Sequence, residues 1–148
     1  MKKYKIIFLL LIVLTFNFIF TACNYETAYV MEDYKGELIV HFIDVGQGDS
    51  TFIQFPNGET SIIDGGTRKS GEKVVKYLKE LGIDKVDYLI ATHPHEDHIG
   101  GLPKVIENFS IGKVYMPEKT ANTLIFEELL NEIKNKDLKV NIAQGGNI

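Results

Sequence analysis

The sequence predicts a mixed α+β fold in which a three-stranded meander is followed by alternating helices and strands. Three observations support this class. Residues 37–64 contain three apolar segments separated by glycine-containing turns. Residues 70–143 alternate between apolar residues at helical spacing and short apolar runs. The chain has 148 residues, of which 45% are hydrophobic and 24% charged, which suits one globular domain.

The meander is expected to consist of strands at 37–44, 50–55 and 60–64. Both faces of the first strand are largely apolar, as in a sheet that is covered on both sides. His41 in this strand is therefore interpreted as a packed residue rather than a metal ligand. Turns are predicted at Gly46-Gln47-Gly48 and at the hairpin Pro56-Asn57-Gly58.

The second part of the chain is expected to contain three helices and three strands. A helix from Ser70, its predicted N-cap, to Leu81 ends before Gly82 in the left-handed conformation. A short helix carries Pro103 in its first turn, and apolar spacing marks a third over 125–133. The intervening strands are expected at 86–91, 113–116 and 139–143.

The first 36 residues are not expected to belong to the fold. Residues 1–22 combine a basic start with an apolar run too short to span a bilayer, which is typical of a signal peptide. Cys23 follows small residues and resembles a bacterial lipidation site, so residues 23–36 would be a lipid-anchored tether. The mature protein would then lie outside the cytoplasm on the cell membrane. The alternatives are a secreted protein or an uncleaved anchor with an incidental cysteine.

The stretch from Thr92 to Gly101 contains the candidate metal ligands. It contains His93, His95, Asp97 and His98 directly after an apolar strand, and imidazole and carboxylate groups are ligands for zinc-like ions. His93 and His95 are two apart, so on an extended segment they face one side. If the loop turns after them, Asp97 and His98 face a second point, which gives a two-metal arrangement with ions roughly 3.5–4 Å apart.

This stretch resembles the His-x-His-x-Asp-His signature of the metallo-β-lactamase fold superfamily. Residues 41–50 and the segment Ile62-Ile63-Asp64-Gly65-Gly66 are similar to the ComEC-like competence (DNA-uptake) branch of that superfamily. The resemblance runs from about Leu38 to the end of the chain. It implies an αββα sandwich, of which residues 37–148 would form roughly the first half.

The resemblance also implies roles for the residues of the site. His93 and His95 would bind a first zinc ion, and Asp97 and His98 a second. Asp97 would also help to orient the nucleophilic water or the leaving group. Metal-bound histidines need acceptors that fix their orientation. Asp64, at the end of a neighbouring strand, is a candidate for this role, with a simple turn aspartate as the alternative, and Asp44 is a further candidate.

The family's later ligands are not matched, because no histidine follows His98. We therefore expect a fragment, a truncated gene, or a subunit completed by a C-terminal half or a second chain. Weak or partial zinc binding is expected, since few ligands would serve two ions. One face of the first sheet would be left partly uncovered and would favour aggregation. The residues expected on that face include Val40, Phe42, Ile53 and Ile63.

These expectations define the functional hypotheses. The first is a zinc-dependent metallo-hydrolase with phosphodiesterase or nuclease chemistry in the intact protein. The alternatives are a non-catalytic remnant that at most binds metal, and a β-lactamase or thioesterase. With 16 Lys and Arg against 20 Asp and Glu, the net charge is −4. An acidic chain offers no extended patch that neutralises phosphates, so a nucleic-acid partner is implied by the resemblance alone.

Overall fold

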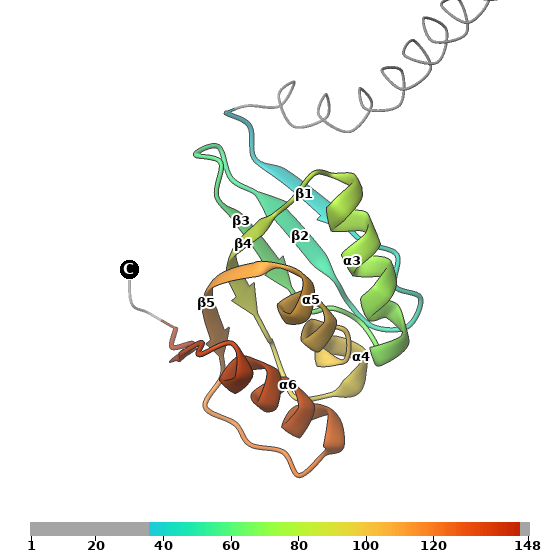
Figure 1. Ribbon diagram of the computed structural model, residues 1–148, viewed down its shortest axis with the longest axis vertical. Helices are drawn as coiled ribbons and strands as arrows, with labels where there is room; N and C mark the ends of the chain where they lie inside the picture. The colour runs from blue at the N-terminus through green and yellow to red at the C-terminus, as the bar shows by residue number, and fades with distance from the viewer. Residues whose placement is uncertain (1–35, 146–148) are drawn as a thin grey trace, which may run out of the picture.

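The computed structural model describes residues 36–145, which form a six-stranded sheet with helices packed on one face (Figure 1). The expected signal segment, Cys23 and nearly all of the expected tether lie outside the described residues. The strands follow one another across the sheet in chain order. They are β1 (Ile39–Phe42), β2 (Thr51–Gln54), β3 (Thr60–Ile63), β4 (Lys85–Ile90), β5 (Ser110–Met116) and β6 (Val140–Ile142).

The sheet changes direction at β3. Strands β1, β2 and β3 pair antiparallel, whereas β3, β4, β5 and β6 pair parallel. Antiparallel neighbours need only tight turns, and Gly58 has a positive φ of 85° in the hairpin between β2 and β3. Parallel neighbours need crossovers, which the helices supply. The predicted meander followed by αβ units is therefore confirmed.

The helices cover one face of the sheet and enclose the hydrophobic core (Figure 1). They are the 3₁₀ turn η1 (Arg68–Ser70), α3 (Gly71–Glu80), α4 (Glu96–Ile99), α5 (Leu102–Asn108) and α6 (Leu124–Asn135). Alternate strand residues and the apolar stripes of the helices are fully buried against each other. The largest of these side chains are Phe52, Ile62, Leu78, Leu89, Leu102, Ile106 and Leu129.

Local signals at the helix ends are partly confirmed. Gly82 adopts a left-handed φ of 73° after α3, and Pro103 lies in the first turn of α5, as predicted. The predicted Ser70 cap is wrong, because its hydroxyl makes no cap bond. The hydroxyl donates instead to the carbonyl oxygen of Val45 at 2.8 Å. The serine thus ties the helix start to the turn after β1 instead of capping α3.

The other face of the sheet is open over the described residues. Phe42 is 84% exposed and Val40 41% exposed, whereas Ile53 and Ile63 are partly buried. The expectation that both faces are covered is therefore wrong for this part of the chain, and the expected uncovered apolar face is present. A hollow of about 690 Å³ on this face is lined by aromatic residues, Phe55, Tyr88 and Tyr115 among them.

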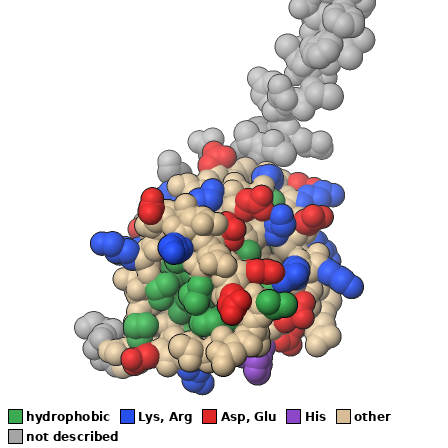
Figure 2. Space-filling view, turned by 60° about the horizontal axis from the view of Figure 1, so that its bottom comes forward, with side chains coloured by type: hydrophobic (Ala, Val, Ile, Leu, Met, Phe, Trp, Pro, Cys, Tyr) green, Lys and Arg blue, Asp and Glu red, His purple; other side chains and the backbone are tan. Residues whose placement is uncertain are grey.

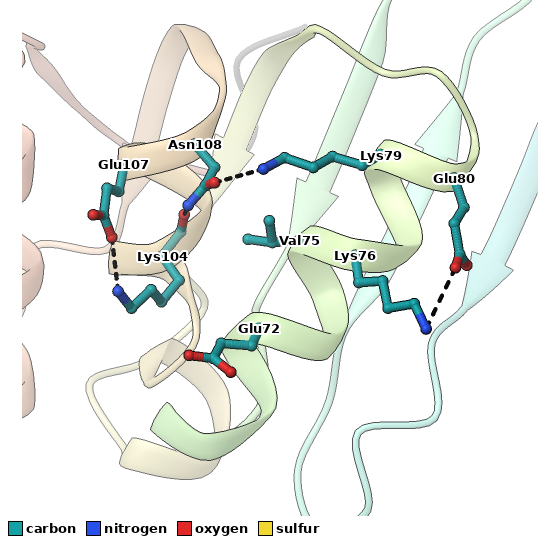
Figure 3. Close-up of a pocket in the computed structure, with 8 residues that line it drawn as sticks. All are labelled: Glu72, Val75, Lys76, Lys79, Glu80, Lys104, Glu107 and Asn108. Atoms are coloured by element: carbon teal, nitrogen blue, oxygen red, sulfur yellow. Dashed lines mark hydrogen bonds and ion pairs between the residues drawn. The ribbon is translucent and has the colours of Figure 1, made fainter.

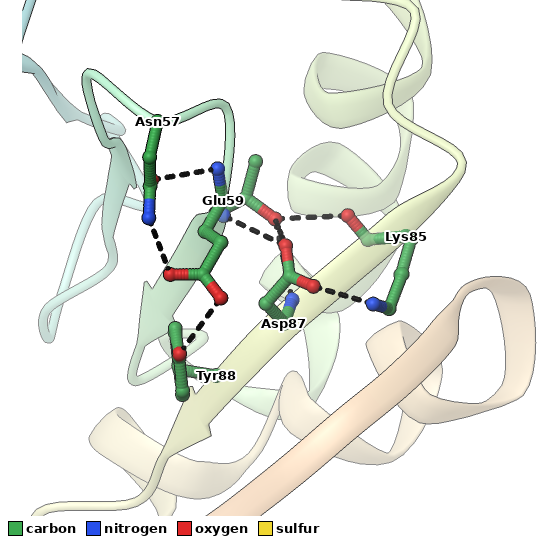
Figure 4. A network of polar contacts seen from close by, with 6 residues as sticks. Asn57, Glu59, Lys85, Asp87 and Tyr88 are labelled. Atoms are coloured by element: carbon green, nitrogen blue, oxygen red, sulfur yellow. Dashed lines mark hydrogen bonds and ion pairs between the residues drawn. The ribbon is translucent and has the colours of Figure 1, made fainter.

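A polar network joins the starts of β3 and β4, at the edge opposite the histidine loop (Figure 4). Asp87 accepts hydrogen bonds from the amide of Thr60 at 2.9 Å and pairs with Lys85 at 2.6 Å. The hydroxyl of Thr60 donates to the carbonyl oxygen of Lys85 at 2.9 Å. Burial raises the pKa of Asp87, but the bonds from Lys85 and Thr60 outweigh it, and the pKa lies below its ordinary value.

A groove between α3 and α5 has mixed charge (Figure 3). Lys104 pairs with Glu107 at 2.8 Å, and Lys76 pairs with Glu80 at 3.6 Å. Lys79 donates to the side chain of Asn108 at 2.8 Å. Exposed pairs of this kind contribute little to stability, and their opposite signs give the groove no preference for a charged ligand.

Candidate metal centre

The candidate centre lies where β3 and β4 end. These strands are parallel neighbours, so the residues that follow them meet at one edge of the sheet. Asp64 directly follows β3, and the segment from Thr92 to His98 follows β4. The chain turns into α4 at Glu96, with His95 at the N-cap position. The sequence-based expectation of an extended loop at Glu96 is therefore wrong, whereas the expected turn before Asp97 and His98 is present.

Asp64 is the buried acceptor of the centre. Only 2% of the residue is exposed, and its backbone has a left-handed φ of 57°, which is uncommon outside glycine. Its carboxylate accepts from the amide of Thr92 at 2.9 Å and from the Thr92 hydroxyl. The same carboxylate lies 3.0 Å from Nδ1 of His98. The expected contact between Asp64 and a histidine of the site is thus present.

The three histidine rings are close together. The ring centroids of His93 and His98 are 3.8 Å apart, and those of His93 and His95 are 4.8 Å apart. The Nδ1 of His93 lies 3.0 Å from the hydroxyl oxygen of Thr92. Among the residues that the structure describes, one group of possible metal ligands stands out: donor atoms of Asp64, His93 and His98 all lie within 4.8 Å of one another.

Two other carboxylates border this group. Oδ2 of Asp97 lies 3.9 Å from Nε2 of His98, and Oδ2 of Asp49 lies 3.6 Å from Nδ1 of His98. His95 and Asp97, both predicted ligands, stand beside the compact group of three rather than within it. His95 is exposed, whereas Asp97 and His98 are half-buried. Each ring nitrogen of His98 therefore has a carboxylate nearby.

Close backbone packing fixes the loops of the centre. The amide of Gly65 donates to the carbonyl oxygen of His98 at 2.7 Å, and the amide of Asp49 donates to that of Asp97 at 3.2 Å. A Cβ on Gly48 would overlap the carbonyl oxygen of Asp97, and one on Gly101 would overlap that of Gly65. Glycine at these positions allows two loops to touch through their backbones. The sequence alone indicated the turns but not this contact.

Asp44 and His41 lie away from the centre. Asp44 accepts from the amide of Gly46 at 3.1 Å and from Lys73 at 3.1 Å, and these two bonds lower its pKa. Its side chain is 86% exposed and stabilises the turn, so the predicted supporting role toward the histidines is wrong. His41 contacts the hydroxyl of Tyr77 at 2.9 Å and the amide of Gln54 at 3.2 Å, which confirms a packed strand histidine.

This architecture and this cluster agree with the match to a family model. Residues 43–144 match the model of the Metallo-beta-lactamase superfamily. The match covers most of the chain and includes every residue of the centre. The chain belongs to the metallo-β-lactamase superfamily, a family of hydrolases. Within it the chain is similar to ComE operon protein 3 of Bacillus subtilis (strain 168), with 28% identity over 126 residues.

Other relatives have different names. A 57-residue segment is 40% identical to Ribonuclease J of Mycoplasma genitalium, and 65 residues are 34% identical to Hydroxyacylglutathione hydrolase of Serratia proteamaculans. The three alignments cover 74%, 38% and 44% of this chain. They cover 16% of ComE operon protein 3, 9% of Ribonuclease J and 24% of Hydroxyacylglutathione hydrolase. The chain therefore spans only a minor part of each relative.

Proposed function

We propose that this chain carries the metal-binding segment of a zinc-dependent hydrolase that cleaves phosphodiesters. The observation that carries the proposal is the convergence of His93, His98 and Asp64 at the ends of two parallel strands. Imidazole and carboxylate donors fit zinc, and a catalytic zinc needs only three protein ligands and an open position. The name Ribonuclease J among the relatives supports nucleic acid as the substrate class.

The hydrogen bonds indicate how the ligands are oriented. Asp64 accepts from Nδ1 of His98, which leaves Nε2 of His98 as the metal-binding atom. The hydroxyl of Thr92 donates a hydrogen bond to Asp64 and accepts one from Nδ1 of His93. Nε2 of His93 is therefore also left free to bind the metal. One buried carboxylate thus sets the tautomer of two histidines, directly and through Thr92. Because its oxygens are engaged in this way, Asp64 would orient the ligands instead of binding the ion.

The chemistry follows from that arrangement. Bound zinc lowers the pKa of a coordinated water and polarises the attacked group. His93, His95 and His98 would hold zinc, and Asp97 would add a carboxylate from the half-buried side of the loop. Asp97 is also placed to accept a proton from the attacking water or to orient it. The predicted second ion would need Asp97 and His98 together, whose nearest atoms are 3.9 Å apart.

A second candidate function is thioester hydrolysis. It is favoured by the likeness to Hydroxyacylglutathione hydrolase, which covers 44% of this chain. The same zinc-activated water would attack a carbonyl carbon in place of phosphorus. A β-lactamase and a non-catalytic metal binder are the remaining alternatives.

The test combines zinc binding with a substrate panel on the purified chain. We expect calorimetry to detect zinc in the wild type and not in a His93→Ala/His98→Ala variant. His41→Gln is the matched control, because this histidine lies outside the centre, and it should bind zinc normally. Zinc-dependent cleavage of bis(4-nitrophenyl) phosphate supports the proposal. Cleavage of S-lactoylglutathione or of nitrocefin instead would favour the thioesterase or β-lactamase, and zinc binding without any turnover would favour the non-catalytic binder.

We also propose that the protein is a lipoprotein held outside the cytoplasm through Cys23. No helix in residues 36–145 is long and apolar enough to cross a membrane. The support for an anchor is the basic start, the apolar run and the small residues before Cys23. Radiolabelled palmitate should label the wild type and not Cys23→Ser. Equal labelling of the two proteins would contradict lipidation at this residue.

A further inference from the structure

A hollow of about 650 Å³ adjoins the metal centre and extends away from it. We call it the loop hollow. It lies between the turn η1, the histidine loop and the start of α6. Its lining consists of Arg68, Lys69, Pro94, His95, Glu96, Thr123, Leu124 and Ile125. His95 belongs to both the hollow and the histidine cluster, so a substrate bound at the centre reaches the hollow without leaving the surface.

The lining of the loop hollow includes a lysine that has no acidic partner among residues 36–145. Its lining contains Arg68 and Lys69 but only one acid, Glu96. Arg68 is paired with Glu128 of α6, whereas no acidic side chain of residues 36–145 lies within ion-pair distance of Lys69. On the face shown in Figure 2, basic and acidic side chains are interspersed. Lys69 is therefore available to a bound anion.

The backbone that carries the two cations is fixed beside the centre. The η1 turn is closed by the amide of Ser70, which donates to the carbonyl oxygen of Thr67 at 2.9 Å. A Cβ on Gly100 would overlap the amide of Arg68, so η1 packs directly on the backbone that follows α4. Because both loops are fixed against each other, the backbone of Lys69 keeps its position relative to the histidine loop.

Another part of the lining is apolar. Leu124 is 75% exposed at the start of α6 although it is a large hydrophobic residue, and Pro94 lies beside His95. A ligand that carries a negative charge at one end and an apolar or aromatic ring at the other would match both parts of the lining. A nucleotide has these two parts, a phosphate and a base, separated by a sugar.

We propose that the loop hollow is the subsite for the nucleotide next to the scissile phosphodiester. Lys69 binds the phosphate of that nucleotide, and the base or sugar packs against Leu124 and Pro94. Arg68 contributes less to phosphate binding, because it is already paired with Glu128. This inference rests on the proposed phosphodiesterase function and names the substrate as a single-stranded nucleic acid held by few phosphate contacts. A small number of contacts agrees with the acidic net charge of the chain.

The test measures binding without turnover. Fluorescein-labelled single-stranded hexamers of DNA and of RNA with the same sequence are titrated with the full chain in EDTA, and anisotropy is followed from 50 to 200 mM salt. Lys69→Ala should weaken binding about tenfold at low salt and reduce the slope of log affinity against log salt by about 0.7. Lys69→Arg should stay within about twofold of the wild type, because it keeps the charge.

Two further variants test whether the loss of affinity in Lys69→Ala comes from a general loss of positive charge or from misfolding. Lys76→Ala removes an exposed lysine of α3, which is paired with Glu80, and should leave the affinity unchanged. Glu128→Gln releases Arg68 and should tighten binding about threefold, a gain that misfolding cannot produce. The hexamer that binds more tightly identifies RNA or DNA as the source of the phosphodiester. Unchanged affinity in Lys69→Ala, or no binding of either hexamer, would overturn the subsite.

The two proposals fail in different ways. Cleavage of bis(4-nitrophenyl) phosphate with an unaltered hexamer affinity in Lys69→Ala would overturn the subsite and leave the hydrolase intact. Weakened hexamer binding in Lys69→Ala, without any cleavage by the wild type, would show that the hollow binds nucleic acid but would overturn both the hydrolase and the role of the hollow as a subsite next to a scissile bond. Cleavage of S-lactoylglutathione together with an unaltered hexamer affinity would overturn both.

Discussion

Nδ1 of His98 lies 3.0 Å from Oδ2 of Asp64, although the two residues are 34 positions apart in the chain. The same carboxylate receives the amide and the hydroxyl of Thr92, so it links the ends of β3 and β4. A buried carboxylate is stable when its oxygens accept several hydrogen bonds, and here each donor belongs to the histidine segment. Asp64 therefore couples the folding of this edge to the orientation of the histidines.

Asp64→Asn tests this coupling. Asparagine tolerates the left-handed backbone of this position but has one acceptor oxygen fewer and no charge. We expect zinc affinity to fall about 10- to 100-fold and the free energy of unfolding to fall by about 1–3 kcal/mol. Calorimetric zinc titration and urea unfolding measure the two effects. Wild-type zinc affinity in this variant would show that Asp64 does not orient the ligands.

Gly48→Ala tests the backbone contact between the turn after β1 and the histidine loop. Gly48 has a φ of 95°, and its new Cβ would overlap the carbonyl oxygen of Asp97. Gly46→Ala is a matched control, because Gly46 has a φ of 76° and open space around it. Both variants carry backbone strain of about 1–2 kcal/mol, and Gly48→Ala should lose clearly more stability and also zinc affinity. Equal unfolding curves for the two variants would contradict the contact.

Phe42→Ser tests the open face of the sheet. Phe42 is 84% exposed, so the substitution should change the free energy of unfolding by no more than about 0.5 kcal/mol. It should also reduce self-association, which light scattering and size-exclusion chromatography detect. Phe52→Ala on the helix-covered face removes a fully buried ring and should cost about 3–5 kcal/mol. Undiminished self-association of Phe42→Ser would show that this face does not mediate self-association.

Acid should weaken the fold through Asp87. Its folded pKa lies below the ordinary value of 3.8, so the ionised carboxylate stabilises the fold above that pH. The stabilisation is lost as the pH falls through the lowered folded pKa. Asp87→Asn should reduce the free energy of unfolding at pH 7 by about 1–3 kcal/mol. It should also make the free energy of unfolding less dependent on pH below pH 4. Urea unfolding from pH 3 to 7 measures this, and parallel curves for both proteins would contradict it.

The strands and helices were predictable because their residues repeat with a clear period. The stripe of Val74, Val75, Leu78 and Leu81 is buried as predicted, and all six predicted strands are present. The helix α4 was missed because four residues are too few to show a helical period. The Ser70 cap was wrong because a tertiary partner, the carbonyl oxygen of Val45, lies 25 positions away. Capping rules consider only residues that are close in the sequence, so they cannot identify such distant partners.

The candidate centre was predictable only in part. The histidines were found because three of them and an aspartate lie within six residues directly after an apolar strand, and Asp64 because it ends a neighbouring strand. Thr92 was not assigned a role, because its position beside His93 does not reveal a bond to Asp64, 28 residues away. The loop hollow was not predicted either. Its walls come from η1, the histidine loop and α6, and only the packing of α6 against the sheet brings them together.

The parallel pairing of β3 with β4 also determines when the centre can form. The segments that carry Asp64 and the histidines are joined through α3, and they meet only after this crossover has closed. Contacts between distant parts of a chain form slowly, since the loop between them must first be ordered. Zinc would therefore recognise the finished fold rather than the unfolded chain, and its main kinetic effect would be to slow unfolding. In a cell, metal supply would then set the lifetime of this protein.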